Sequence, residues 1–203
     1  MNSKDIIKAF ESIRRHITEN EEYLTKLDRQ NGDGDLGISM KEGFTAVCNA
    51  LAGTDESDLG KILIKAAGAL NEAAPSSLGT ILSLAFSGMS RALRGKRDMT
   101  LHDLAQAMEA GVQKIMDKAG SKPGEKTILD AICPAVQVFL DAGEGDFKEA
   151  AQKAARAAAE GSEATRQMRS VHGRAAYYGE QSVGILDGGS VAGRLIFEAL
   201  TDL

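Results

Sequence analysis

Apolar residues recur along the chain with the period of an α-helix, and the alternation typical of half-buried strands is hard to find. In the first segment, which starts near Ser3, the residues Ile6, Phe10, Ile13 and Ile17 follow one another at steps of three or four. This spacing places apolar side chains on one face of a helix, and that face must be buried against other elements. The chain is therefore predicted to be all-α.

Polar and glycine-rich breaks divide the pattern into about eight helices. The expected helices begin near Ser3, Gly37, Leu59, Pro75, Thr100, Thr127, Asp146 and Val191. The first is expected to continue to the polar stretch LDRQNGDGDLG, and Thr100 should cap the fifth with Asp103 as its capping-box partner. Most of the loops are short, and no linker is visible. The chain is therefore predicted to be one domain, residues 1–203, folded as a helical bundle or barrel.

The composition excludes several classes of protein. The net charge is -5 with both signs interspersed, whereas a general nucleic-acid binder needs a basic face. The first residues mix charges with apolar positions, unlike a signal peptide, and no apolar run approaches the ~20 residues that span a bilayer. Cys48 and Cys133 lack metal-type spacing and are expected to be buried, reduced thiols. We expect a cytoplasmic protein with no membrane or nucleic-acid partner.

Two loops differ from the others: residues 28–37, and the long irregular stretch 173–190. The first carries Asp28, Asp33 and Asp35 among glycines, directly before a predicted helix. Carboxylates this close together repel one another, and the arrangement becomes favourable when a hard divalent cation lies between them. The pattern therefore predicts a metal site.

Two alternatives to this interpretation stay open. A solvated turn would use the same residue types. A calcium loop of the EF-hand type, starting at Asn31, would place Asp33, Asp35 and Glu42 at ligand positions, but Leu36 stands where that loop needs glycine. Magnesium takes part of its coordination from substrate phosphates, and the start of the following helix suits an anion. The sequence therefore favours magnesium with a phosphate ligand.

Three segments resemble, in order, motifs of the L subunit or L domain of dihydroxyacetone kinases. EYLTKLDRQNGDGDLGISMKEGF, residues 22–44, is similar to the aspartate loop of that family. PGEKTILDAICPAV (123–136) and GRAAYYGEQSVGILDGG (173–189) are similar to its Pro-Gly-Asp-Lys-Thr and Gly-Arg-Ala elements. The resemblance covers nearly the whole chain. It implies a barrel of eight antiparallel helices with a nucleotide at one end.

The resemblance also implies a set of site residues. Asp28, Asp33 and Asp35 would hold two magnesium ions that bridge to the phosphates of ADP or ATP. The residues expected to contact the nucleotide are Leu36, Gly37, Ile38, Ser39, Ser76, Ser77, Ile128 and Arg174, with Leu186, Asp187 and Gly188 as a lid. No catalytic side chain is expected on this chain, because the metal and the position of the nucleotide account for the chemistry.

The sequence departs from the family pattern at some of these positions. Leu36 and Ser39 stand where the family usually has His and Asn, which puts the identity of the sugar in doubt. Several residues also have simpler explanations than a ligand contact. Those that can serve as helix caps are Ser76, Ser77 and Thr127. Those expected at the surface or near helix ends are His16, His102 and His172, and Tyr177 and Tyr178 are expected to pack against other residues.

In the family, a K subunit binds the sugar covalently, and an M subunit with a phosphohistidine rephosphorylates ADP that stays bound to the L subunit. A lone L-type domain is typical of this phosphotransferase-system form. The chain is expected to form a homodimer or a complex with the K subunit. Three alternatives stay open: an ATP-dependent kinase subunit for another short ketose, a non-catalytic regulator that binds a transcription factor, and a calcium-binding helical protein.

Overall fold

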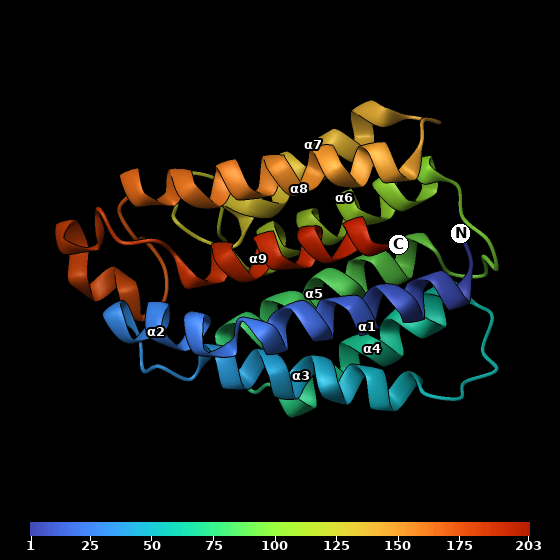
Figure 1. Ribbon diagram of the computed structural model, residues 1–203, viewed down its shortest axis with the longest axis horizontal. Coiled ribbons are helices and arrows are strands. Elements are labelled where there is room, and N and C mark those ends of the chain that lie inside the picture. The colour runs from blue at the N-terminus through green and yellow to red at the C-terminus, as the bar shows by residue number, and fades with distance from the viewer.

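The computed structural model describes residues 1–203 and consists of nine α-helices and three short 3-10 helices, with no sheet (Figure 1). The α-helices are α1 (Ser3–Glu19), α2 (Glu21–Asn31), α3 (Leu36–Leu51), α4 (Leu59–Ala73), α5 (Ser77–Ala92), α6 (Leu101–Ala119), α7 (Leu129–Ala142), α8 (Phe147–Ala164) and α9 (Gly188–Ala199). The 3-10 helices are η1 (Thr165–Gln167), η2 (Arg174–Ser182) and η3 (Leu200–Asp202). The all-α prediction is confirmed.

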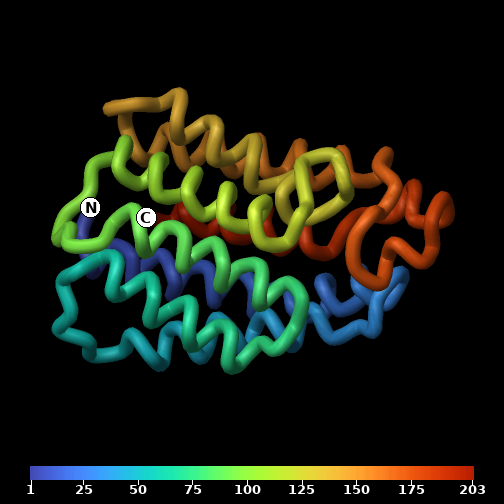
Figure 2. The backbone as a smooth tube through the Cα atoms, turned by 180° about the vertical axis from the view of Figure 1, so that it is seen from behind, coloured from blue at the N-terminus to red at the C-terminus, as the bar shows by residue number.

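Eight of the helices form a closed ring. Contacts join α1 to α3, continue in chain order from α3 to α9, and return from α9 to α1. Neighbouring helices in the ring run in opposite directions, as both views show (Figures 1 and 2). The antiparallel eight-helix barrel is therefore present. The ninth helix, α2, continues beyond α1 and lies at the end of the ring where α3, α5, α7 and α9 begin.

The first predicted helix is wrong in one respect, because the structure divides it at Asn20. The side-chain amide of Asn20 donates to the carbonyl of His16 at 2.9 Å and competes there with the backbone ladder. The apolar pattern continues through this break, so spacing alone does not reveal it. The last helix also begins earlier than expected, at Gly188, and η2 gives local order to part of the predicted irregular stretch.

Helix starts follow the expected capping residues. The Thr100 hydroxyl accepts from the Asp103 N–H at 3.1 Å, and the Asp103 carboxylate accepts from the Thr100 N–H at 3.0 Å, which completes the predicted capping box. Asp58 caps α4 by accepting from the Lys61 N–H, and Asp146 caps α8 by accepting from the Glu149 N–H. These side chains satisfy N–H groups that have no partner inside the helix. They explain why polar clusters in the sequence mark the helix boundaries.

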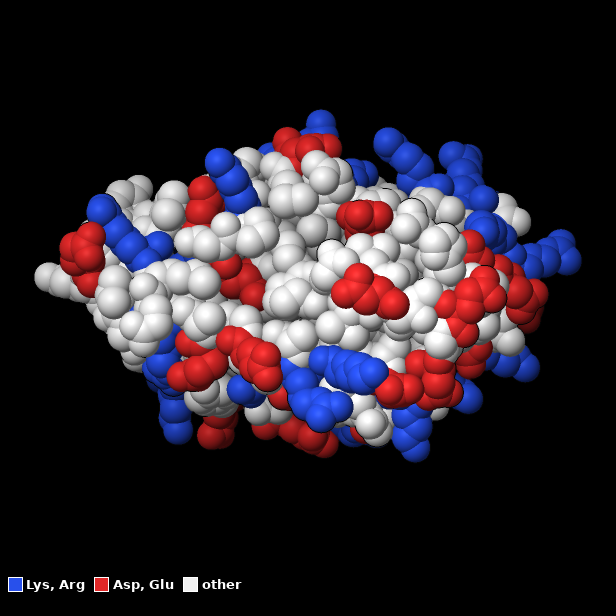
Figure 3. Space-filling model, turned by 90° about the horizontal axis from the view of Figure 1, so that it is seen from above, with Lys and Arg blue, Asp and Glu red and all other residues white.

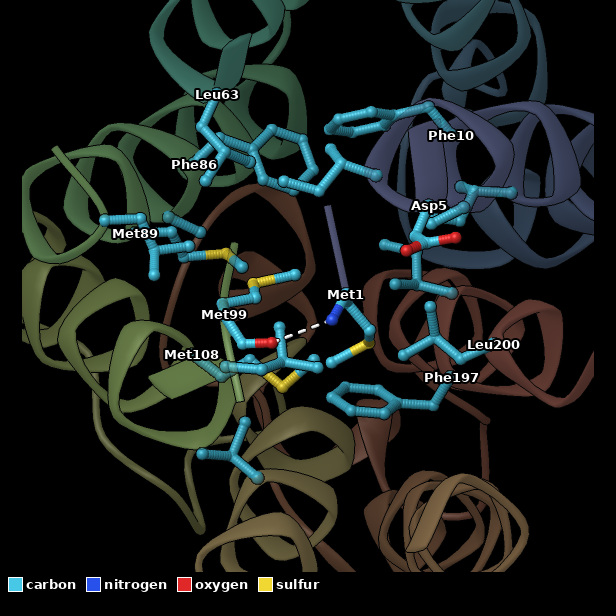
Figure 4. Close-up of a pocket in the computed structure, with 18 of the residues that line it drawn as sticks. Met1, Asp5, Phe10, Leu63, Phe86, Met89, Met99, Met108, Phe197 and Leu200 are labelled. Atoms are coloured by element: carbon cyan, nitrogen blue, oxygen red, sulfur yellow. Dashed lines mark hydrogen bonds between the residues drawn. The ribbon is translucent and has the colours of Figure 1, made fainter. Parts of the chain in front are cut away.

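The interior of the barrel is apolar and encloses a cavity of about 140 Å³ (Figure 4). Phe10 and Phe86 both line it and pack edge to face against each other, with ring centroids 5.2 Å apart. The N-terminal amino group of Met1 donates to the carbonyl of Met99 at 2.8 Å and ties the start of the chain to this region. The cavity therefore belongs to the half of the barrel that holds the chain termini (Figure 1).

The surface mixes charges of both signs. On the face shown in Figure 3, basic and acidic side chains both occur, uncharged residues cover much of the middle, and several basic side chains lie together at one end. None of the helices has both the length and the apolar character required to cross a lipid bilayer. The two cysteines, Cys48 and Cys133, are free but only partly buried, which corrects the expectation of full burial. Burial raises the pKa of the Cys133 thiol to about 11, so it stays protonated.

Two glycines provide a matched test of the close packing between α5 and α6. A Cβ atom on Gly88 would lie 2.6 Å from the carbonyl oxygen of Ala110, whereas one on Gly68 would meet nothing within 4 Å. We expect Gly88→Ala to lower the free energy of unfolding by about 1–3 kcal/mol, because two helix backbones must move apart. Gly68→Ala should raise it by about 0.5–1 kcal/mol through helix propensity. Urea denaturation measures both, and equal effects of the two substitutions would contradict the described packing.

Candidate functional site

A pocket of about 430 Å³ opens at the end of the barrel where α3, α5 and α9 begin. It collects residues from the aspartate loop, the start of α5, the segment after residue 171 and the start of α9. The expected site residues among its lining are Asp28, Asp33, Asp35, Leu36, Ser76, Ser77, Arg174, Leu186, Asp187 and Gly188. The structure therefore brings together residues that lie up to 160 positions apart in the chain.

The three aspartates form one cluster. One carboxylate oxygen from each lies within 4.8 Å of the others. Asp33 and Asp35 are exposed, and Asp28, in the last turns of α2, is partly buried. The Asp28 carboxylate accepts from the N–H groups of Gly34 at 2.7 Å, Asp35 at 3.1 Å and Leu36 at 3.4 Å. Asp28 thus folds the loop around its own carboxylate and directs the other two acids to the same place.

The donor set of this cluster fits a divalent cation. Partial desolvation of the carboxylate raises the pKa of Asp35, and the negative charges of Asp33 and Asp28 raise it further. A hard cation between the carboxylates would remove this repulsion, and oxygen ligands of this kind suit Mg²⁺. The EF-hand alternative is contradicted, because α3 begins at Leu36 and contains Glu42, the residue required as the last calcium ligand.

Three helix N-termini face the same pocket. The Ser76 hydroxyl accepts from the Gly79 N–H at 3.2 Å and caps α5, while Asp187 caps α9 by accepting from the Ser190 N–H at 2.6 Å. Ser39, one turn into α3, donates its hydroxyl to Ser76 at 2.9 Å and links two of these helix starts. Free N–H groups and the positive ends of helix dipoles favour anions. The pocket therefore combines a carboxylate cluster whose donor set fits a cation with a backbone environment that suits phosphate.

Arg174 supplies a positive side chain at the pocket. It begins η2, and its guanidinium lies 2.8 Å from the Asp33 carboxylate. Both side chains are largely exposed, at 70% and 41%, so the pair contributes little to stability. An exposed pair of this kind can exchange partners at small cost. Arg174 is therefore held at the pocket by little more than this one exposed ion pair.

Four of the expected nucleotide contacts do not line the pocket. Ile38 points outward from α3 and is 47% exposed, while Ile128 is buried in the core. Gly37 packs against the backbone of Glu21 on α2, and Ser39 reaches the site only through its bond to Ser76. The segment proposed as a lid is firmly anchored here. Leu186 is buried in the core, and Asp187 and Gly188 form the start of α9.

Other pocket residues went unrecognised in the sequence. Among them are Asn31, Pro75, His172 and Gly189. His172 pairs with Glu125 at 2.6 Å, and this bond lowers the pKa of Glu125. In the sequence, His172 stands directly before the Gly-Arg-Ala motif, and this position indicates that it lies near the pocket. The expectation that Tyr177 packs against other residues is wrong, because its side chain is 92% exposed.

The sequence matches the DAK2 domain family over residues 30–202. It is 30% identical, over 88% of this chain and 86% of the relative, to the ADP-binding subunit DhaL of the PEP-dependent dihydroxyacetone kinase of Escherichia coli. It is 28% identical to the L-erythrulose 1-kinase of Mycolicibacterium smegmatis, over 98% of this chain but 35% of that enzyme.

The fold matches a solved structure, the dihydroxyacetone kinase from C. freundii in complex with AMP-PNP and Mg²⁺. The TM-score is 0.80 with 20% sequence identity, and the match covers 100% of this chain and 34% of that one. At this identity the likeness shows a shared fold. The chain thus corresponds to about a third of the length of the larger kinase.

Asp187 should make stability depend on pH. Burial raises its pKa from 3.8 to about 6, although the Ser190 N–H and Lys126 partly offset the shift. The pKa of Asp187 is higher in the folded protein than in the unfolded chain, so folding favours its protonated form. The folded protein therefore has its full stability with respect to this group below pH ~4, and it loses part of that stability as the pH rises through 6. Asp187→Asn keeps a capping side chain without the charge.

We expect Asp187→Asn to match the original protein in free energy of unfolding at pH 4 and to exceed it by on the order of 1–3 kcal/mol at pH 8. Urea denaturation at each pH, with EDTA to remove cations, measures the difference. A gap that is the same at both pH values would show that the buried charge of Asp187 is not its origin.

Proposed function

The chain belongs to the DAK2 domain family, and from this membership and the geometry of its pocket we propose that it is the nucleotide-binding subunit of a dihydroxyacetone kinase. It would hold ADP or ATP with Mg²⁺ at the open end of the barrel. The observation that carries the proposal is the convergence of Asp28, Asp33 and Asp35 with three helix N-termini in one pocket. Cation ligands beside anion-binding backbone are what a metal-bound diphosphate requires.

Different residues would bind different parts of the ligand. Asp28, Asp33 and Asp35 would coordinate the cation, with room for two ions if each takes waters and phosphate oxygens as further ligands. The first N–H groups of α3, α5 and α9 would receive phosphate oxygens, and Arg174 would balance the remaining negative charge. When bound, Mg²⁺ neutralises charge on the phosphoryl group as it moves between oxygens.

The chain contributes positioning rather than a nucleophile. Direct transfer of a phosphoryl group requires only that donor and acceptor are aligned and that charge is balanced. The sugar would therefore be presented by a K-type partner, docked at the open end of the barrel.

The relatives favour a kinase over the regulator that the sequence left open. The Escherichia coli relative is named as a subunit of a PEP-dependent enzyme. This supports a phosphoprotein of the M type as the phosphoryl donor, with ADP retained between turnovers. The kinase of Mycolicibacterium smegmatis is named for L-erythrulose, so dihydroxyacetone and other short ketoses both belong in the first substrate screen.

Analysis of the purified protein tests this function. The protein should be prepared without added nucleotide and denatured, and the released small molecules should be identified by mass spectrometry. We expect ADP in near-stoichiometric amount. Addition of a K-type partner and sugar should then give product with a phosphorylated M-type donor and not with ATP. Absence of bound nucleotide together with no affinity for ADP in excess Mg²⁺ would reject the proposal.

Asp33 allows binding to be separated from folding. It is exposed, and its one ion pair is with the exposed Arg174, so Asp33→Asn should change the free energy of unfolding by less than about 0.5 kcal/mol. We expect the same substitution to weaken Mg²⁺-dependent ADP binding by roughly 100-fold, since it removes a charged ligand. Calorimetric titration measures the affinity.

Asp55→Asn serves as the matched control, because Asp55 is an exposed acid in the loop between α3 and α4, at the opposite end of the barrel. It should bind ADP as the original protein does. An Asp33→Asn protein that keeps full affinity would remove the aspartate cluster from the binding site.

A further inference from the structure

Lys126 is a buried lysine in the connection between α6 and α7. The residue is buried, with 4% relative exposure, and its ammonium group forms no ion pair, although the negative charge of Asp187 acts on it from a distance. Four backbone carbonyl oxygens surround Nζ instead. They belong to Ile185 at 2.5 Å, Ser182 at 2.7 Å, Thr165 at 2.8 Å and Met168 at 3.2 Å. A buried charge is costly unless it is fully hydrogen-bonded, and here four acceptors meet three N–H donors.

The backbone at this position is also unusual. Lys126 has φ 60°, and it is the one residue other than glycine with a positive φ. A non-glycine residue in this region costs on the order of 1 kcal/mol and persists only where surrounding contacts hold it. Glycine would avoid the strain and a hydrophobic residue would avoid the buried charge. The lysine must therefore provide something that neither of them can.

The four oxygens identify what the lysine holds. Thr165 and Met168 lie where the chain leaves α8, and Ser182 and Ile185 lie where it returns toward α9. A single ammonium group thus closes the base of the loop formed by residues 165–187. The neighbouring residue, Glu125, holds the same loop through His172.

This loop delivers one side of the pocket. Arg174 lies within it, in η2, and the loop ends at Asp187, which caps α9 at the pocket wall. Arg174 itself is 70% exposed and is paired only with Asp33, so its position depends on how the base of the loop is held. Lys126 is not among the residues that line the pocket. Its hydrogen bonds therefore reach the pocket through the loop, and its charge reaches it through Asp187.

We propose that Lys126 is a positioning residue for the nucleotide, fixing the loop 165–187 so that Arg174 and the start of α9 face the phosphates. The proposal rests on the function proposed above. It assigns to the lysine of the PGEKT segment a role through backbone carbonyls and not through contact with the ligand.

Lys126→Met tests the role, because methionine keeps much of the length and removes the donors. Lys122→Met is the matched control, since Lys122 is an exposed lysine in the same connection. We expect Lys126→Met to weaken Mg²⁺-dependent ADP binding by roughly 10- to 100-fold, the range found for groups that orient a ligand's direct contacts. Hydrogen exchange should accelerate in residues 165–187 and stay unchanged in α3 to α6. Lys122→Met should change neither quantity.

A double-mutant cycle with Arg174→Ala separates positioning from a general loss of stability. If Lys126 acts through Arg174, Lys126→Met should lose most of its effect on ADP affinity once Arg174 has been removed. Strictly additive effects in the cycle would overturn the proposal. So would unchanged affinity in a folded Lys126→Met protein.

Lys126→Asn provides a second variant, because asparagine tolerates the positive φ and relieves the strain. It should fold and show the same loss of affinity. If neither variant folds, Lys126 serves the stability of the whole domain and the positioning role is rejected. Failure of the original protein to bind ADP with Mg²⁺ would instead reject the proposed function, and the exchange rates of residues 165–187 would still show whether Lys126 holds the loop.

Discussion

The alternation of helix direction around a closed ring is the constraint on which the rest of the structure depends. Because neighbouring helices are antiparallel, α3, α5, α7 and α9 all begin at the same end of the barrel. Each start carries N–H groups without intrahelical partners and the positive end of a dipole. Four such starts around one rim make that end of the barrel electrostatically suited to an anion.

Charged side chains on two sides of the pocket add to the field of the helix starts. The aspartate cluster places negative charge beside the positive helix ends, and Asp28 stabilises its loop by accepting three backbone N–H groups. A cation is then needed to make the cluster compatible with a phosphate ligand. On the other side, Lys126 gathers four carbonyl oxygens beneath the loop that carries Arg174. In both cases, hydrogen bonds to backbone groups fix the position of charged side chains: the aspartates on one side and Arg174 on the other.

The sequence predicted the helical class, most helix boundaries and the clustering of three aspartates, because each depends on residues close together in the chain. Period and capping residues are local, and so is the spacing of Asp28, Asp33 and Asp35. The break at Asn20 was missed since the apolar pattern continues through it. The burial of Lys126 was missed because its acceptors lie 39 to 59 residues further along the chain. The outward direction of Ile38 depends on how α3 packs, which the motif does not specify.

The central claim is that the aspartate cluster and the helix starts together form a site for a metal-bound diphosphate. Crystals grown with ADP and Mn²⁺, with diffraction recorded at the manganese absorption edge, test it most directly. The account predicts anomalous density among the carboxylates of Asp28, Asp33 and Asp35, with the phosphates of ADP against the first turns of α3, α5 and α9. Bound ADP with manganese elsewhere, or ADP whose phosphates point away from these helix starts, would contradict it.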